Sequence, residues 1–152
     1  MQIIRKAKHE DISRIQQLVG QAGLQTDGIE QNVDHFLIME KGTNSLSTNE
    51  DETCLIAVVG FELQEQTGLL RSFVINEKSD QFNILEIMRA VIDYSKKNNL
   101  QKLYLCTRHQ QSVKLFNMLG FRLAGEIPVE MQSFEHYQNI SSEQPAIMYY
   151  TF

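Results

Sequence analysis

Apolar residues in the first third of the chain follow two different periods. Ile3 and Ile4 open a short apolar run that predicts a strand, and apolar residues then recur at helical spacing over residues 12–19. Acidic residues just before this stretch favour a helix N-terminus. Residues 29–33 suggest a second, shorter helix, and FLIMEK at residues 36–41 is typical of a strand.

The central part of the chain has the pattern of a β-hairpin. A long apolar run at residues 54–63 predicts a strand that is covered on both faces. The turn sequence EQTG follows at residues 65–68, and LLRSFVI at residues 69–75 predicts the next strand. Because the turn is short, we expect these two strands to pair with each other.

The clearest helix pattern comes next. Apolar residues recur at positions i, i+3, i+4, i+7 and i+8 over residues 84–92. Asn83 and Glu86 resemble a capping box at its start. The sequence KKNN at residues 96–99 predicts its end, with an asparagine in the left-handed cap position.

The last third of the chain alternates strands with a helix and a long polar stretch. Residues 102–107 predict a buried strand, and an apolar helical stripe follows that ends at Gly120. Residues 121–124 and 146–152 predict strands on either side of a polar segment at residues 126–145. The resulting order, βααβββαβαββ, favours a mixed sheet in an α/β fold.

Composition and charge exclude several classes of protein. Apolar residues make up 42% of the chain and charged residues 22%, values typical of a globular domain. The net charge of −5 argues against nucleic acid and anionic membranes as partners, since both require clustered positive charge. The chain starts without an apolar signal segment and has no run long enough to span a membrane, so we expect a cytoplasmic protein.

The cysteines and histidines give no pattern of metal ligands. Cys54 and Cys106 are too few for a disulfide framework and lack zinc spacing, so we interpret both as small core residues and expect no metal. His9, His35 and His136 are scattered, and we expect them at the surface.

The combined order of elements resembles the GNAT family, the acyl-CoA-dependent N-acetyltransferases. The resemblance rests on residues 3–19, on the hairpin at residues 54–75 and on the strand–helix–LGF signature at residues 102–121. It implies one GNAT-like domain over residues 1–152. It also implies a mixed, mostly antiparallel sheet of about seven strands flanked by helices, with a V-shaped splay between strands four and five.

The resemblance also implies acetyl-CoA as the co-substrate. The backbone of Phe73, Val74 and Ile75 is expected to pair with the pantetheine arm as an added strand would. Backbone N–H groups of the next segment are expected to bind the pyrophosphate. That segment comprises Asp80, Gln81, Phe82, Asn83, Ile84 and Leu85.

Three further residues are candidates for the acceptor side of the site. Glu62 on the third strand is the candidate base, with a solvated carboxylate as the alternative. Arg71 and Ser72 lie beside the expected acyl group, where Arg71 suits an acidic substrate or, alternatively, forms a structural ion pair. Phe73 and Ile75 alternate with Arg71, so we expect them to share its face and to be core residues.

The presumed pyrophosphate segment departs from the family pattern R/Q-x-x-G-x-G/A. It contains no glycine, and Asp80 stands at the arginine position. A carboxylate about 6 Å from a phosphate costs roughly 1–3 kcal/mol per charge. Asn83 tolerates a left-handed backbone, and Lys78 and Arg89 are the cations that could compensate.

The presumed general acid also departs from the family pattern. The position of the usual tyrosine holds Phe116, which has no proton to give. His109 replaces the usual asparagine and is the candidate acid in its place. Tyr149 and Tyr150 point to opposite faces of the last strand, so one of them could stand in for the missing tyrosine.

Two principal functions remain open on these residues. The first is transfer of an acetyl group from acetyl-CoA to a primary amine on a small molecule or peptide. The second is a catalytically inactive GNAT-fold domain that binds or regulates without CoA, and a third is an enzyme with another anionic cofactor. A homodimer is possible, and residues 131–137 form either a lid over the amine pocket or an ordered surface loop.

Overall fold

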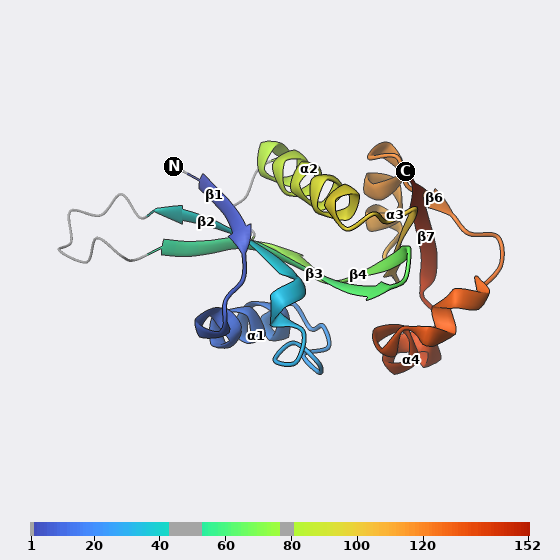
Figure 1. The fold of residues 1–152 in the computed structure, drawn as a ribbon, viewed down its shortest axis with the longest axis horizontal. Coiled ribbons are helices and arrows are strands. Elements are labelled where there is room, and N and C mark those ends of the chain that lie inside the picture. The colour runs from blue at the N-terminus through green and yellow to red at the C-terminus, as the bar shows by residue number, and fades with distance from the viewer. Residues whose placement is uncertain (1, 43–52, 77–80) are drawn as a thin grey trace. The chain divides into compact units, whose positions relative to one another are not determined.

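In the computed structural model, seven strands form one sheet in the order β1-β2-β3-β4-β5-β7-β6 (Figure 1). The structure describes residues 2–42, 53–76 and 81–152. The strands are β1 (Gln2–Lys6), β2 (Phe36–Gly42), β3 (Thr53–Gln64), β4 (Thr67–Ile75), β5 (Lys102–Thr107), β6 (Arg122–Leu123) and β7 (Ala146–Thr151). The α-helices are α1 (Ile12–Gln21), α2 (Gln81–Lys97), α3 (Gln110–Met118) and α4 (Glu135–Ile140).

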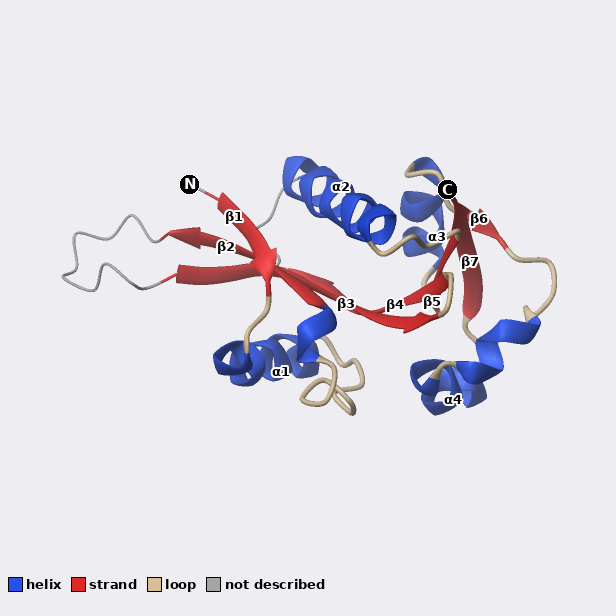
Figure 2. Cartoon of the chain, viewed as in Figure 1, coloured by secondary structure: helices blue, strands red, loops and turns tan. Residues whose placement is uncertain are grey.

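The sheet is mixed, as the sequence predicts. β4 and β5 pair in parallel, whereas the pairs β1–β2, β2–β3, β5–β7 and β6–β7 are antiparallel. β3 and β4 are neighbours joined by a turn at residues 65–66, which confirms the predicted hairpin. Figure 2 shows helices flanking the strands, so the predicted fold class is confirmed. Within the described ranges, no helix is long and apolar enough to cross a membrane.

The chain divides into two compact units, which are described separately. The first comprises Met1–Gly60 and Ser72–Asp93, and the second comprises Phe61–Arg71 and Tyr94–Phe152. β4 contributes residues to both units, and the boundary in this strand falls between Arg71 and Ser72. The expectation of a single domain stays a prediction.

In the first unit, α1 packs its apolar face on β2 and β3. Ile15 and Val19 of α1 are fully buried in a core that includes Phe36, Ile38 and Val58. Figure 1 shows α1 and the beginning of α2 on opposite sides of β1, β2 and β3. The strands of this unit are therefore covered on both faces, which accounts for the continuous apolar run in β3.

Gly60 in β3 is required by close packing. It pairs with Phe36 of β2, and a Cβ atom at this position would lie 2.4 Å from the Phe36 ring. The ring therefore occupies the space that any larger residue at position 60 would need.

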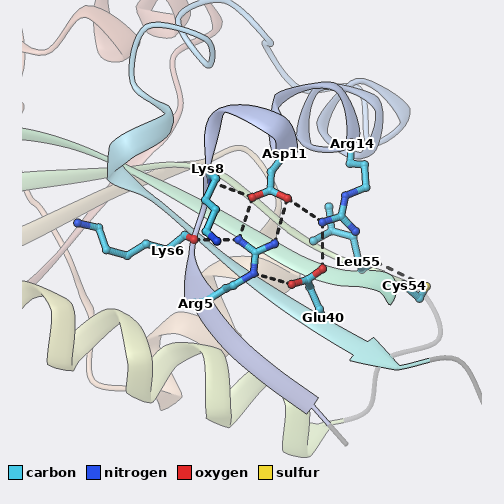
Figure 3. A network of polar contacts seen from close by, with 8 residues as sticks. All are labelled: Arg5, Lys6, Lys8, Asp11, Arg14, Glu40, Cys54 and Leu55. Atoms are coloured by element: carbon cyan, nitrogen blue, oxygen red, sulfur yellow. Dashed lines mark hydrogen bonds and ion pairs between the residues drawn. The ribbon is translucent and has the colours of Figure 1, made fainter. Parts of the chain in front are cut away.

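An ion-pair network joins β1, α1 and β2 in the same unit (Figure 3). Arg5 donates to the two oxygens of Asp11 at 2.9 and 3.1 Å and to Glu40 Oε1 at 2.7 Å. Arg14 bridges the same two carboxylates at 2.8 and 3.0 Å, and the backbone N–H of Lys8 donates to Asp11 at 2.7 Å. Burial alone would raise the pKa of Asp11, but the bonds from Arg5 and Arg14 outweigh it and hold that pKa well below its ordinary value.

In the second unit, β5 and β7 pack against the segment that precedes β7. Buried residues from β4, β5, α4 and their neighbours form one apolar cluster: Leu69, Tyr104, Met131, Phe134, Tyr137 and Ile147. The Tyr104 hydroxyl donates a hydrogen bond to the Glu130 carboxylate. These contacts hold the segment 126–145 against the strands.

Two predicted helix ends are confirmed by left-handed residues. Asn99 has φ 58 just after α2, and Gly120 has φ 104 just after α3. A Cβ atom on Gly120 would also lie 2.9 Å from the Tyr150 ring, so both the backbone and the packing require glycine.

One predicted element is wrong, and another is shorter than expected. Instead of a helix at residues 29–33, residues 29–32 form turns and a 3₁₀ helix follows at Val33–His35. Gly28 has φ 85 and its carbonyl accepts the Asn32 side-chain amide at 2.8 Å, a local bond that competes with helix formation. The predicted strand at residues 121–124 shrinks to the two residues of β6.

The polar segment at residues 126–145 is ordered structure. It contains 3₁₀ helices at Val129–Ser133 and Ser141–Glu143 on either side of α4. Its buried apolar residues recur at every third position: Met131, Phe134, Tyr137 and Ile140. This spacing of apolar residues indicates helical structure, but the polar residues between them obscure the pattern in the sequence.

We predict that Asp11→Asn lowers the free energy of unfolding by about 3 kcal/mol at pH 7, because it removes the carboxylate that pairs with both Arg5 and Arg14. Asp11 has a lowered pKa in the folded protein, so its contribution is present above its unfolded pKa and lost as pH falls below about 4. Urea unfolding at pH 7 and at lower pH measures both effects.

The exposed neighbour variant Glu10→Gln is the control and should match the wild type at each pH. Equal stability of Asp11→Asn and wild type at pH 7 would contradict the structural role of the network.

Candidate functional site

β4 changes its backbone conformation at Ser72. This residue has φ 56, a left-handed value inside a strand, and it is buried. Such a residue acts as a bulge and resets the alternation of side chains along the strand. It stands immediately before the backbone segment that the resemblance assigns to pantetheine.

The prediction that Phe73 and Ile75 are core residues is wrong, whereas their sharing a face with Arg71 stays a prediction. Before the bulge, Leu69 belongs to the apolar cluster with α4. After it, Val74 is the buried residue and joins the core with α1, while Phe73 and Ile75 are only half-buried. Residues 68–72 are all buried, and burial alternates only after Ser72, where Val74 is buried between the half-buried Phe73 and Ile75.

The register of β4 with β5 is short. It contains the pairs Thr67–Lys102, Gly68–Leu103 and Leu69–Tyr104, while β4 itself runs on to Ile75. Beyond β4, the N–H of Asn76 donates to the carbonyl of Ile56 in β3 at 2.6 Å. β4 is thus anchored to its hairpin partner at this end.

The residues matched to the pyrophosphate segment form the first turns of α2. Asp80 lies outside the described residues, as does Lys78. Among Gln81, Phe82, Asn83, Ile84 and Leu85, none has a positive φ. The described part of the segment therefore adopts a conformation that needs no glycine.

The side chains of this first turn point in different directions. Phe82 and Leu85 expose 62% and 56% of their surfaces, so neither is a core residue. Asn83 is buried, and its side chain accepts a hydrogen bond from Gln2 in β1. The capping box predicted for Asn83 is wrong, because α2 already includes Gln81 and Asn83 is its third residue.

Glu62 caps the start of α4. Its Oε1 accepts the backbone N–H of Glu135 at 2.9 Å, and its Oε2 accepts that of His136 at 2.7 Å. The first N–H groups of a helix have no partner within the helix, and a carboxylate there also meets the positive end of the helix dipole. Glu62 is therefore not simply a solvated carboxylate, and its role as a base stays a prediction.

His136 is more buried than the sequence suggested. Burial, with a further contribution from the positive charge of Arg71, lowers the pKa of its imidazole to about 4. Its Nδ1 atom is buried and has no hydrogen-bond partner among the described residues. Arg71 is 4% exposed, whereas Glu62 and His136 are half-buried. Single-sequence reasoning missed His136 because no motif surrounds it.

His109 stands at the start of α3 on the wall of a pocket. The pocket has a volume of about 270 Å³, and Thr107, Arg108, Gln110, Val113, Glu143, Gln144 and Ala146 also line it. The imidazole is exposed, and the His109 backbone N–H donates to the Thr107 hydroxyl at 3.3 Å. The role of His109 as an acid stays a prediction.

The aromatic residues near the presumed acid form two separate groups. Phe116 is 8% exposed and packs edge-on against Phe121, with ring centroids 5.7 Å apart. Tyr150 packs 5.4 Å from Phe121, whereas Tyr149 packs against the cluster that contains Tyr104. The prediction that Tyr149 and Tyr150 point to opposite faces is confirmed.

The two cysteines differ. Cys54 is exposed, so its interpretation as a core residue is wrong. It stands near the beginning of β3, before the buried residues of that strand. Cys106 is half-buried, and burial raises the pKa of its thiol to about 12, as expected for an unreactive thiol. In the ranges that the structure describes, no His, Cys, Asp or Glu side chains gather into a group that could hold a metal ion.

We predict that Glu62→Ala destabilises α4 specifically. Loss of a side-chain acceptor at a helix start costs about 1–2 kcal/mol. Backbone amides of Glu135 and His136 should then exchange their hydrogens faster, as measured by hydrogen exchange. Glu126→Ala, an exposed glutamate in the same segment, is the control, and unchanged exchange at both amides would contradict the capping role.

No family model matches the chain. The uncharacterized Bacillus subtilis protein YwlB is 23% identical over 146 residues, which cover 95% of this chain and 93% of YwlB.

Several solved structures resemble the fold of the chain at low sequence identity. N-acetylglutamate synthase from Neisseria gonorrhoeae, complexed with coenzyme A and N-acetyl-glutamate, gives a TM-score of 0.78 at 16% identity and covers 99% of this chain. The chain spans only 35% of that synthase chain. Rv2747 from Mycobacterium tuberculosis, in complex with CoA and NLQ, gives a TM-score of 0.75 at 14% identity, and the match covers 99% of both chains.

A GNAT-family acetyltransferase from Staphylococcus aureus gives a TM-score of 0.70 at 13% identity, again over 99% of both chains. The strand order, the parallel β4–β5 pair and these matches agree. The chain therefore has the fold of the GNAT acetyltransferases.

Proposed function

We propose that the protein transfers an acetyl group from acetyl-CoA to a primary amine. The observation that carries the proposal is the likeness, over 99% of this chain, to structures solved with coenzyme A. Fold alone does not fix function, so the residues of the site must fit the ligand. Bound acetyl-CoA would supply an activated thioester, and the protein would supply binding, orientation and proton transfer.

The residues proposed to bind CoA all belong to the first unit. The backbone of Phe73, Val74 and Ile75 follows the bulge at Ser72 and offers N–H and C=O groups for pairing with the pantetheine amides. The start of α2 at residues 81–84 presents N–H groups that have no partner within the helix and suits a pyrophosphate. Because residues 81–85 need no positive φ, the loss of the family's glycines is compatible with this role.

The proposed acceptor side lies in the second unit, with Ser72 next to it in the sequence. Arg71 is buried beside the start of α4, where a guanidinium group suits a carboxylate on the acceptor. N-acetylglutamate synthase, one of the structural neighbours, is complexed with N-acetyl-glutamate. We therefore propose an amine that also carries a carboxylate, such as an amino acid or the end of a peptide.

The missing tyrosine is compatible with transfer. A thiol has a pKa of about 8.5, so CoA can leave as a thiolate without a strong acid. His109, exposed on the pocket wall, is the proposed residue to return a proton to the sulfur. Chemistry would then depend mainly on the positions of the two substrates.

We predict that acetyl-CoA and CoA both raise the melting temperature by about 5–10 °C at a hundredfold excess over the dissociation constant, since such binding adds about 2.7 kcal/mol. ATP serves as the anion control and should give no comparable shift. Differential scanning fluorimetry measures this. The absence of a shift at millimolar acetyl-CoA would reject the acetyltransferase and favour the inactive alternative.

We predict that Arg71→Lys raises KM for carboxylate-bearing acceptors about 10- to 100-fold and leaves KM for acetyl-CoA within threefold, because lysine cannot pair with a carboxylate through two N–H groups. The assay follows CoA thiol release with amino acids and with their α-amides. An equal rise in KM for the amino acids and for their α-amides would show that Arg71 has a structural role and does not bind the acceptor carboxylate.

A further inference from the structure

The pocket at the start of α3 is formed within the second unit. The described residues that line it come from the end of β5, the start of α3 and the start of β7 with the residues just before it. Its volume of about 270 Å³ lies just below the range of about 300–1,000 Å³ that is usual for drug-sized ligands. The pocket therefore suits a molecule the size of a small metabolite.

Two side chains of opposite charge line this pocket. An ion pair joins Arg108 Nε to Glu143 Oε2 at 3.7 Å, a distance longer than that of a hydrogen bond. The two side chains expose 52% and 42% of their surfaces, and exposed pairs of this kind contribute little to stability. Both charged groups are therefore accessible to a ligand at little cost to the fold.

The atoms outside this ion pair suit a ligand that carries both charges. The pair uses one nitrogen of Arg108 and one oxygen of Glu143. A guanidinium group has further N–H donors, and a carboxylate has a second oxygen. A ligand carboxylate can thus accept hydrogen bonds from Arg108 while a ligand ammonium group donates to Glu143.

A ligand with a single charge fits the pair less well. An anion without a cationic group would be repelled by Glu143, and an amine without a carboxylate would be repelled by Arg108. A zwitterion places each of its charges beside the opposite one. The pair therefore favours a zwitterionic ligand over phosphate, a simple carboxylate or a simple amine.

The remaining walls of the pocket match the two ends of such a ligand. Gln110 is the first residue of α3 and lines the pocket, and no side-chain hydrogen bond caps this helix at His109. The first N–H groups of a helix have no partner within the helix and attract a carboxylate. Thr107 adds a hydroxyl group, whereas Val113 and Ala146 add apolar surface for a carbon stem.

We propose that this pocket binds a free α-amino acid, with its carboxylate at Arg108 and the start of α3 and its ammonium group at Glu143. Arg71 is not among the described residues that line the pocket, so this site differs from the carboxylate site proposed for Arg71. The inference goes beyond the proposed function and does not require it, because the binding involves no CoA.

An NMR titration of the ¹⁵N-labelled full chain without CoA tests the site. The probes are L-alanine and L-glutamine, each compared with its α-amide, which lacks the carboxylate, and its N-acetyl derivative, which lacks the ammonium group. The backbone amide signals of Val113, Gln144 and Ala146 report on the pocket. We expect both amino acids to shift these signals and all four derivatives to bind at least tenfold more weakly.

Two variants assign each charge of the ligand to its partner. Arg108→Gln and Glu143→Gln change exposed side chains, so both should fold as the wild type does. Their matched controls are Lys114→Gln and Glu126→Gln, which change exposed residues that do not line the pocket. We expect binding of L-alanine to weaken about tenfold in both pocket variants and to stay within twofold in both controls.

The derivatives make this assignment sharper. The preference for L-alanine over its α-amide should shrink to threefold or less in Arg108→Gln, because the partner of the carboxylate is gone. The preference for L-alanine over N-acetyl-L-alanine should shrink in the same way in Glu143→Gln. Arg71→Lys should bind L-alanine within twofold of the wild type.

Four outcomes would overturn the inference. They are no shift at Val113, Gln144 and Ala146 with tens of millimolar amino acid, a derivative that binds as tightly as its amino acid, unchanged binding in both pocket variants, and weakened binding in Arg71→Lys. None of them bears on the melting shift with acetyl-CoA, so the proposed function would stand. Conversely, the absence of that melting shift would leave the amino-acid site standing.

Discussion

The left-handed residue at Ser72 is the constraint on which the arrangement of the site depends. A strand normally alternates its side chains with a period of two, and a residue with φ 56 resets that period. Leu69 belongs to the α4 cluster, and Val74 belongs to the α1 core. One strand thus serves two cores, and Arg71 lies next to the point where it changes between them. A β-branched residue at position 72 would oppose this backbone conformation.

Two polar clusters in the chain illustrate different uses of buried charge. In the first unit, both carboxylates of the Arg5–Asp11–Arg14–Glu40 network receive hydrogen bonds from arginine, so the network ties three elements together. In the second unit, Glu62 accepts two backbone N–H groups, whereas Nδ1 of His136 has no hydrogen-bond partner among the described residues.

The sequence alone supports most of the fold because its signals are local. The hairpin of β3 and β4, the apolar face of α2 and the buried strand β5 each follow from a short period of apolar residues. The caps at Asn99 and Gly120 follow from which residues tolerate positive φ. The GNAT resemblance rests on the order of these elements, which is why it holds although no solved neighbour quoted above exceeds 16% identity.

Only the tertiary structure decides what depends on contacts between distant residues. Glu62 becomes a cap because α4, more than seventy positions later in the chain, returns to β3. His136 becomes buried for the same reason, and no neighbouring residue in the sequence signals it. The apolar anchors of residues 126–145 are hidden among polar residues, and they become a core only against Leu69 and Tyr104. Local periodicity determines which elements form, and long-range packing determines which side chains meet, because partners far apart in sequence leave no local pattern.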